Sequence, residues 1–283
     1  MNERGEAVLD DGRRVHYSIS GTGPPIVLCH GTPWSSWVWH RIVPLLAPTR
    51  RVYTWDMVGY GQSDKAEGDV SLAIQTDLLA KLLREWNLTE PAIVGHDFGG
   101  AVALRSHLLT KIGYRSMTLI DPVVLSPWGS PFFTLVRENA HVFAQLPPAL
   151  HRALVAEYVS TTGGPALCLE EVNQLVEPWS SGPEAKSAFY RQIAQADQRY
   201  TEEVEAFLST IRIPIQIVWG AEDAWLPVEQ ASRLHDAIPH SVLTVVAAAG
   251  HLLPLQQPRQ LAKLLLNGPE DRSPREGSSM NPR

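Results

Sequence analysis

The stretch PAIVGHDFGGAVALRSHLL, residues 91–109, decides the fold, because a short apolar run gives way within a few residues to a segment of helical character. A single carboxylate, Asp97, stands at the centre of this change. Gly95 and Gly99 suit a sharp turn, since a side chain at either place would collide with the neighbouring strand or helix. Asp alone is common in turns. The whole stretch nevertheless predicts a strand, a tight elbow and a helix, with Asp97 as a candidate nucleophile.

Outward from the elbow, short β-branched runs bounded by Gly and Pro alternate with longer segments of helical period. This alternation is typical of a parallel sheet flanked by helices, so we expect an α/β fold. Several runs are apolar throughout, as strands covered on both faces are. Strands are expected at residues 15–19, 26–29, 52–55, 92–94, 116–120, 214–219 and 242–246.

A change in composition divides the chain. From about residue 124 to 208 the strand pattern stops, and segments such as QLPPAL and EPWSSGPEA punctuate helical stretches. We interpret 124–208 as an inserted helical cap and residues 1–123 with 209–267 as the core domain. The remainder, 268–283, has few apolar side chains to bury and is expected to be a disordered tail.

The overall composition excludes several functional classes. Of 283 residues, 44% are hydrophobic and 19% charged, which suits a large core and argues against disorder. The formal net charge of −6 makes nucleic acid an unexpected partner. The apolar runs are too short to span a bilayer, so no membrane segment is expected.

The cysteines and the first residues bear on the cellular compartment. Cys29 and Cys168 cannot form a disulfide framework, and the charged opening MNERGEAVLDDGRR has no apolar secretory core. We therefore expect a reduced, cytoplasmic protein. The ten histidines are scattered without paired Cys or HExxH spacing, so neither a metal nor another cofactor is expected.

The elbow GHDFGG resembles that of the α/β-hydrolase superfamily, and its central Asp is similar to the nucleophile of the epoxide hydrolase and haloalkane dehalogenase branch. The resemblance covers about residues 6–267 and is weakest in the insertion. It implies a triad in the chain order nucleophile, acid, base.

Two further residues match that order. Asp223, in WGAEDAWLP, and His251, in AAAGHLLP, each follow an expected strand. Both therefore lie at carboxyl ends of strands, where open parallel sheets bind ligands. Asp121 also follows an expected strand, and some dehalogenases take their acid from that place. The sequence around Asp223 favours it over Asp121.

The nucleophile type indicates the chemistry. A carboxylate is already ionised at neutral pH and can displace a leaving group from saturated carbon. Attack would leave an alkyl ester on Asp97, which water activated by His251 would hydrolyse, with Asp223 orienting the imidazole. Backbone N–H groups of Phe98 and Thr32 are the expected oxyanion donors.

The neighbours of Asp97 favour an epoxide over a halide. The resemblance implies that a dehalogenase binds the departing halide with a Trp directly after the nucleophile, whereas Phe98 has no side-chain donor. Thr32 stands where one dehalogenase group carries Asn. Tryptophans could compensate, and those expected near the substrate are Trp34, Trp128 and Trp225, with Trp37 and Trp179 as further candidates.

An epoxide hydrolase also needs a proton donor for the emerging alkoxide, which the family takes from one or two cap tyrosines. Tyr190 resembles one of these, and His141 lies near the expected place of the other. Both are expected to contact substrate. Tyr158 lies further along the chain than the pattern suggests.

These residues together predict a hydrolase that opens a small apolar epoxide to a vicinal diol, as a monomer or homodimer. A haloalkane dehalogenase is the nearest alternative. A cyclase or lyase that uses Asp97 only as an acid or base, and a ligand-binding protein on the same fold, also remain open.

Overall fold

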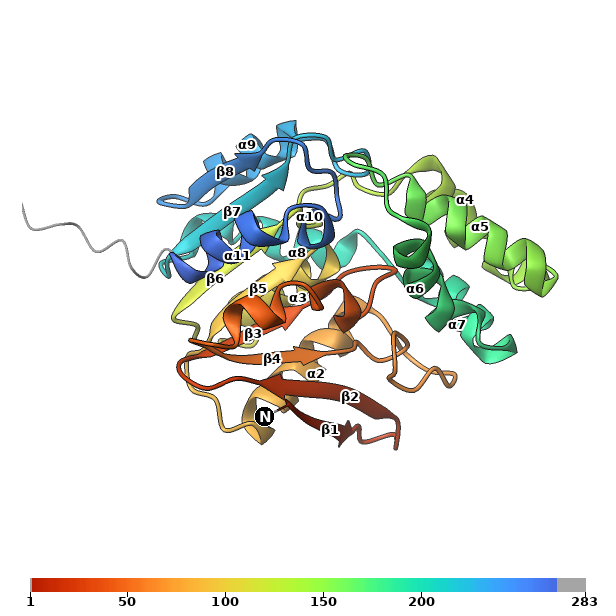
Figure 1. Ribbon diagram of the computed structural model, residues 1–283, viewed down its shortest axis with the longest axis horizontal. Coiled ribbons are helices and arrows are strands. Elements are labelled where there is room, and N and C mark those ends of the chain that lie inside the picture. Colours follow the sequence, from red (N-terminus) through yellow and green to blue (C-terminus); the bar gives the residue numbers. More distant parts are fainter. Residues whose placement is uncertain (1, 269–283) are drawn as a thin grey trace, which may run out of the picture.

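The computed structural model describes residues 2–268 and places the strands of this part of the chain in one sheet (Figure 1). The strand order is β1-β2-β4-β3-β5-β6-β7-β8. Pairing is antiparallel between β1 and β2 and between β2 and β4, and parallel from β4 to β8. The bounds are β1 (Asn2–Val8), β2 (Arg14–Ser20), β3 (Pro25–Cys29), β4 (Arg51–Trp55), β5 (Ala92–His96), β6 (Ser116–Ile120), β7 (Ile215–Gly220) and β8 (Val242–Val246). The predicted α/β fold with a mostly parallel sheet is confirmed.

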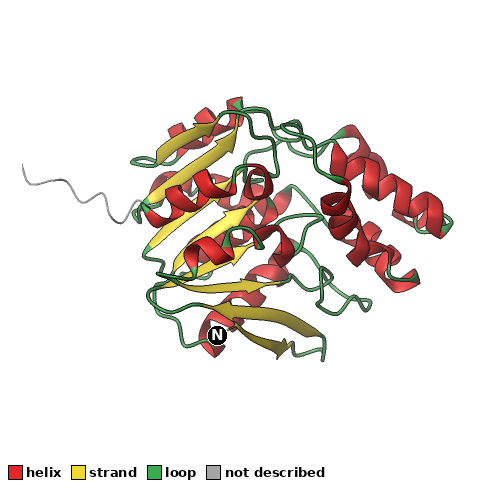
Figure 2. Cartoon of the chain, viewed as in Figure 1, coloured by secondary structure: helices red, strands yellow, loops and turns green. Residues whose placement is uncertain are grey.

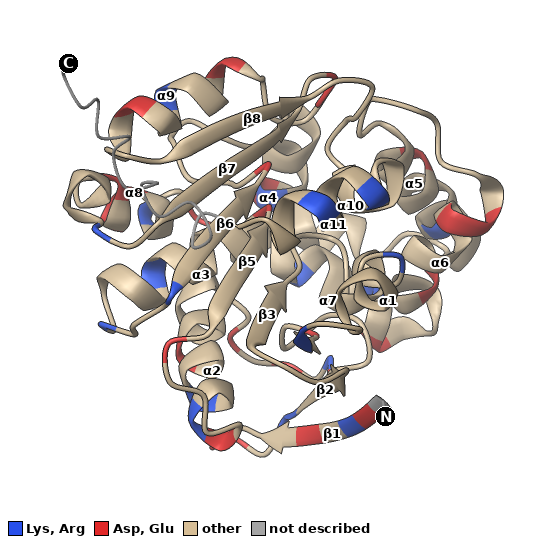
Figure 3. Cartoon of the chain, turned by 60° about the vertical axis from the view of Figure 1, so that its left-hand side comes forward, with Lys and Arg blue, Asp and Glu red and all other residues tan. Residues whose placement is uncertain are grey.

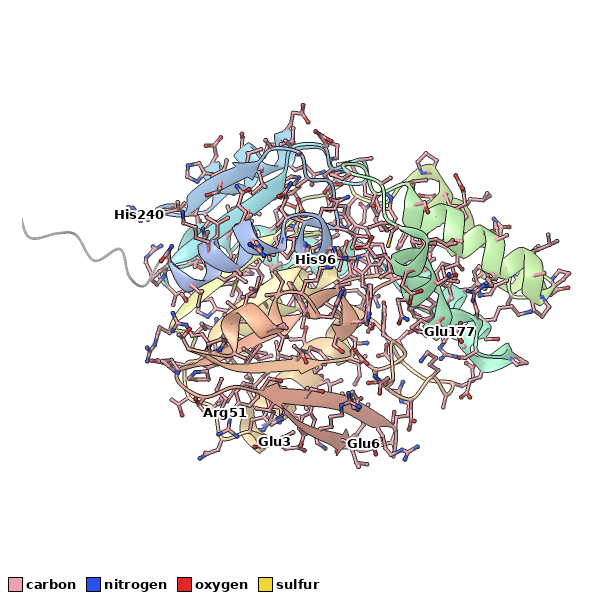
Figure 4. All side chains as sticks on the ribbon, in the orientation of Figure 1. Glu3, Glu6, Arg51, His96, Glu177 and His240 are labelled. Carbon is pink, nitrogen blue, oxygen red and sulfur yellow. The ribbon has the colours of Figure 1, made fainter. Side chains whose placement is uncertain are left out.

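The strand that the sequence did not predict is β1. Its residues carry charges of both signs and show no apolar run, yet they pair with β2 along the whole length of β1 (Figure 3). Glu3 lies 3.7 Å from Arg51 and Glu6 lies 3.6 Å from Arg14 (Figure 4 labels Glu3, Glu6 and Arg51). Charged side chains suit an edge strand, because they discourage pairing with another chain.

Helices cover both faces of the sheet (Figure 2). α3 packs against α2 and α8, whereas α11 packs against α1 and α10, and α9 contacts β7 and β8. The bounds are η1 (Ser36–Trp39), α1 (Val43–Leu46), α2 (Leu72–Glu85), α3 (Phe98–Leu108), α8 (Arg199–Glu205), η2 (Leu208–Thr210), α9 (Glu229–Ala237), α10 (Leu253–Gln256) and α11 (Pro258–Leu266). The covered strands β3, β6 and β7 are almost entirely buried, which suits their mainly apolar sequences.

Four helices of the predicted insertion pack on one another and lie to one side of the sheet (Figure 1, in green). We call them the helical layer: α4 (Pro131–Phe143), α5 (Pro148–Ser160), α6 (Leu169–Ser180) and α7 (Pro183–Ala194). The fifth helix of the insertion, α8, instead packs on α3. The division into a core and a cap at residues 124–208 stays a prediction.

Two other expectations concern the C-terminal residues and membrane-spanning segments. The predicted disordered tail, 268–283, lies outside the described residues except for Gly268. Among residues 2–268, the structure contains no helix with both the length and the apolar character that a membrane span requires.

Candidate active site

The elbow after β5 places Asp97 in an unusual backbone conformation. Asp97 has φ 53° and ψ −121°, a backbone region that residues other than Gly rarely adopt. A Cβ atom at Gly95 would meet the carbonyl oxygen of Gly99, and one at Gly99 would meet that of Cys29. The glycines therefore let strand and helix approach closely enough to hold Asp97 in this strained turn.

Both oxygens of the buried Asp97 carboxylate have partners. Oδ1 accepts hydrogen bonds from the backbone N–H groups of Thr32 and Phe98, each at 2.6 Å. Oδ2 lies 3.2 Å from Nε2 of His251. The two expected oxyanion donors thus converge on one oxygen of Asp97, while the other oxygen faces the imidazole.

His251 lies between two carboxylates. Its Nδ1 is 2.8 Å from Oδ2 of Asp223, and the side chains of both residues are fully buried. The backbone N–H groups of Trp225 and Leu226 donate to the other Asp223 oxygen at 2.8 and 2.9 Å. Burial opposes the positive charge of His251, but the charges and hydrogen bonds of Asp223 and then Asp97 outweigh it and raise the pKa of His251 well above its usual value.

His96 supports the backbone behind His251. Its Nε2 donates to the His251 carbonyl oxygen at 2.8 Å, and the two rings lie 5.0 Å apart (Figure 4 labels His96). Burial lowers the pKa of His96 to about 4, and the neighbouring His251 adds to that effect. His96 is therefore a neutral support at physiological pH.

Of the two candidate acids, Asp223 is the one that hydrogen-bonds His251. Asp121, at the end of β6, instead accepts the Gly220 N–H at 2.7 Å. Its Oδ2 is buried without a hydrogen-bond partner among residues 2–268. Burial, followed by the charge of Asp223, raises the pKa of Asp121 well above its usual value.

A cavity of about 40 Å³ opens beside Asp97, below the helical layer. Phe98, Trp128 and Phe133 form an edge-to-face cluster in its wall, with ring centroids 5.5 to 6.4 Å apart. The remaining lining residues are Thr32, Asp97, Val123, Gly129, Ser130, Tyr158, Trp225 and Leu226. The cavity is therefore mainly apolar, with Asp97 and a few hydroxyl groups as its polar features.

Tyr158, on α5, is the site residue that sequence reasoning passed over. It lines the cavity with Asp97, and its pKa is raised by burial and secondly by the charge of Asp97. Tyr158 and Asp97 thus border the same cavity, the one from the helical layer and the other from the elbow. It is one of three tyrosines in the predicted insertion, and the family resemblance favoured Tyr190 over it.

Two predicted contact residues lie elsewhere. The Tyr190 hydroxyl donates to Nδ1 of His151 at 2.7 Å, and Nε2 of His151 donates to the Trp179 carbonyl at 3.0 Å. His141 is exposed on α4. Neither Tyr190 nor His141 is among the described residues that line the cavity, so we leave both out of the proposed site.

Of the tryptophans expected near the substrate, some line the cavity and others do not. Trp128 and Trp225 line the cavity, but their indole N–H groups donate to Thr201 at 2.8 Å and Thr161 at 3.0 Å. Trp34 is buried behind Trp225, with the two rings stacked 5.3 Å apart.

Hydrogen bonds connect the helical layer to the loop that contains Thr32 and Pro33. The Thr32 N–H of this loop is one of the two expected oxyanion donors. The Thr32 hydroxyl donates to Oε1 of Gln192, on α7, at 2.6 Å, and the Tyr60 hydroxyl donates to the same oxygen at 3.0 Å. The Trp179 indole, on α6, donates to the Pro33 carbonyl at 2.7 Å. The loop that supplies the Thr32 N–H is thus held from both α6 and α7.

The part of the chain that the structure describes, residues 2–268, contains no group of three or more His, Cys, Asp and Glu side chains arranged to hold a metal ion.

The sequence resembles curated proteins over most of its length. An uncharacterized protein of Mycobacterium tuberculosis is 30% identical over 258 residues, which cover 85% of this chain and 73% of the relative. Haloalkane dehalogenase 2 of the same organism is 26% identical, over 89% of this chain and 90% of the relative.

Solved structures share the fold. An α/β hydrolase fold protein from Burkholderia ambifaria superposes with a TM-score of 0.89 at 41% identity, over 93% of this chain and 100% of the other. The epoxide hydrolase CorEH superposes with a TM-score of 0.73 at 20% identity, over 94% and 98% of the two chains, which shows the common fold alone.

The family model described as the alpha/beta hydrolase fold matches residues 24–258. This match spans the elbow, both candidate acids and His251. The chain therefore belongs to the α/β-hydrolase fold family.

Proposed function

We propose that the protein is an epoxide hydrolase that forms a covalent ester on Asp97 and releases a vicinal diol. The observation that carries the proposal is the placement of the Asp97 carboxylate. Oδ1 accepts two backbone N–H groups, while Oδ2 faces His251. A carboxylate fixed in this way presents one oxygen for attack and keeps the other where negative charge develops later.

In the first step, Oδ2 of Asp97 attacks an epoxide carbon, a C–O bond forms and the ring C–O bond breaks. The freed alkoxide takes the proton of the Tyr158 hydroxyl. Until then the Asp97 charge raises the pKa of Tyr158, after the larger effect of burial. Esterification removes that charge, so the phenolate becomes less unfavourable as it forms. The proton carried by His251 then restores the Tyr158 hydroxyl.

In the second step, neutral His251 takes a proton from water, and the resulting hydroxide attacks Cγ of Asp97. The negative charge develops on Oδ1, where the Thr32 and Phe98 N–H groups already point. Collapse breaks the ester bond, and His251 protonates the departing diol oxygen. The Asp97 carboxylic acid then returns its proton to His251, which Asp223 keeps oriented.

We propose residues 124–208 as the cap of this enzyme. The support is that Phe133 on α4 and Tyr158 on α5 line the same cavity as Asp97. The helical layer would exclude water from the first step and supply the proton donor.

Haloalkane dehalogenation is the second candidate, supported by the similarity to haloalkane dehalogenase 2. A departing halide needs donors aimed into the cavity. The indole N–H groups of Trp128 and Trp225 are already bonded to Thr201 and Thr161, and Phe98 has no donor. These contacts favour the epoxide.

One isotope experiment tests the covalent step. Excess enzyme is mixed with 1,2-epoxyhexane in ¹⁸O-labelled water for a single turnover. The ester route predicts that label enters the Asp97 side chain, detected in its proteolytic peptide, and that the first diol formed is unlabelled. Label in the diol with an unlabelled Asp97 would contradict the proposal and favour direct attack by water.

A trapping experiment with His251→Gln is the companion. Attack on the epoxide should proceed and hydrolysis should stall, so the intact mass of the variant rises by one epoxide. 1-Bromohexane serves as the parallel substrate. In the wild type, bromide release from 1-bromohexane without any diol from the epoxide would favour the dehalogenase.

A further inference from the structure

A second cavity adjoins the one beside Asp97. It measures about 420 Å³, and Ser130, Tyr158 and Trp225 line both cavities. These three residues therefore form the boundary between the two cavities. The other residues of this outer cavity are Pro131, Phe132, Leu154, Glu157, Thr161 and Ala224.

The dividing wall is an aromatic pair. Tyr158 and Trp225 stack with centroids 4.5 Å apart and ring planes inclined by 18°. Trp225 is fixed through its backbone N–H to Asp223 and its indole to Thr161. Tyr158 packs on Phe132, with centroids 4.8 Å apart. The Tyr158–Trp225 pair thus borders the inner cavity on one side and the mainly apolar outer cavity on the other.

The two volumes fit different parts of one ligand. The inner cavity, at about 40 Å³, is about a tenth of the outer one and suits only a small reacting group such as an oxirane. The outer 420 Å³ lies within the usual size of ligand pockets, about 300–1,000 Å³. The bulk of a substrate that reacts at Asp97 must then lie in the outer cavity.

The lining of the outer cavity limits the chemistry of that bulk. Pro131, Phe132 and Leu154 offer apolar surface, and the charged residue among those that line it, Glu157, is exposed. An alkyl chain would be stabilised there, whereas an anionic end group would meet the Glu157 carboxylate.

We propose that the substrate is a terminal epoxide with a linear, uncharged apolar tail. The oxirane lies beside Asp97, and the tail passes the edge of the Tyr158–Trp225 pair into the outer cavity. This inference rests on the proposed epoxide hydrolysis for the reacting group, but the tail site stands on the cavity geometry alone.

A chain-length series tests the inference. With 1,2-epoxides from propane to decane, kcat/KM should rise by up to about fourfold for each added CH₂ until the outer cavity is full. Leu154→Trp narrows that cavity and should lower kcat/KM for 1,2-epoxydecane by roughly tenfold or more, with little change for 1,2-epoxypropane.

Leu150→Trp is the matched control, because Leu150 lies on the same helix and is exposed. It should leave the whole series unchanged. Leu154→Ala enlarges the cavity and should move the optimum to longer tails, which keeps the test open if Leu154→Trp folds poorly. An equal loss on short and long epoxides with Leu154→Trp, or a flat series in the wild type, would overturn the tail site.

Binding of 1-octanol, measured by calorimetry, separates this inference from the proposed function. Octanol has the tail and no reactive ring. If it binds the wild type and Leu150→Trp but not Leu154→Trp, while no epoxide is turned over, the tail site holds and epoxide hydrolysis fails. Epoxide turnover without octanol binding would mean the opposite.

Discussion

The site has a sheet side and a helical-layer side, and different kinds of interaction hold the residues of each side in place. On the sheet side, the carboxylates of Asp97 and Asp223 each accept two backbone N–H groups and also face His251. On the other side, Phe133 and Tyr158 are held mainly by ring contacts. Under the proposed function, the first side fixes where the reacting atoms lie, and the second fixes what size of molecule is admitted. Substitutions on the two sides should therefore fail differently.

The largest effect is expected for Asp97→Asn. The amide keeps the size of the side chain and can still accept the Thr32 and Phe98 N–H groups, but it is a poor nucleophile. Turnover of 1,2-epoxyhexane should fall by about 10⁴-fold or more. Steady-state kinetics measure the loss, and thermal unfolding checks that the fold is kept. Retention of more than a tenth of the activity would remove Asp97 from the reaction.

The pair Asp223→Asn and Asp121→Asn compares the two candidate acids within the sheet side. Loss of the Asp223 charge leaves His251 without its orienting partner, so kcat should fall by about 10³- to 10⁴-fold. In Asp121→Asn the new amide would still accept the Gly220 N–H and would resemble the protonated acid that burial favours, so activity should stay within a few-fold of wild type. Reversed effects in the same kinetic assay would assign Asp121 as the acid.

Tyr158→Phe tests the helical layer's own contribution to chemistry. It removes a proton donor, so the rate of ring opening, followed by stopped-flow, should fall by about 10²-fold. Tyr190→Phe is the matched control: its hydroxyl bonds to His151, so kcat should hold while the free energy of unfolding falls by about 1 kcal/mol. An unchanged rate of ring opening in Tyr158→Phe would show that Tyr158 acts only through packing.

The smallest effect is expected where the two sides meet. Gln192→Met and Thr32→Val each remove the 2.6 Å hydrogen bond between α7 and the oxyanion loop. Each should lower kcat by roughly tenfold or less, and the double variant should be little worse than either single one, because both break the same interaction. Additive losses in this double-mutant cycle would show that the hydrogen bond does not position the Thr32 N–H.

The sequence predicted the sheet side better than the helical side. Asp97, Asp223 and His251 could be located because each follows a short apolar strand, and the carboxyl ends of parallel strands meet at one edge. Their assembly needs little beyond local backbone pattern. The edge strand β1 was missed because its charged sequence lacks the apolar run on which strand prediction depends.

The helical side could not be assigned from sequence, because packing between helices decides which face of each helix meets the site. Tyr158 and Tyr190 both lie on helices of the helical layer, and only the three-dimensional arrangement places the first in the cavity that Asp97 lines and the second against His151. Asn139, with φ −129° and ψ 26°, interrupts α4 before His141. Helical spacing counted across this break does not give the direction of His141.

The hydrogen bond between Thr32 and Gln192 has a consequence for chimeras that combine segments of two family members. A chimera that joins this sheet to the helices of another family member would keep Asp97, Asp223 and His251, yet the loop that contains Thr32 would lose its hydrogen bond to α7 unless the graft carried a glutamine at position 192. Exchange of residues 124–208 between family members is therefore less modular than the separate layers of the fold suggest. In an inactive chimera, the first residue to restore would be the glutamine at position 192.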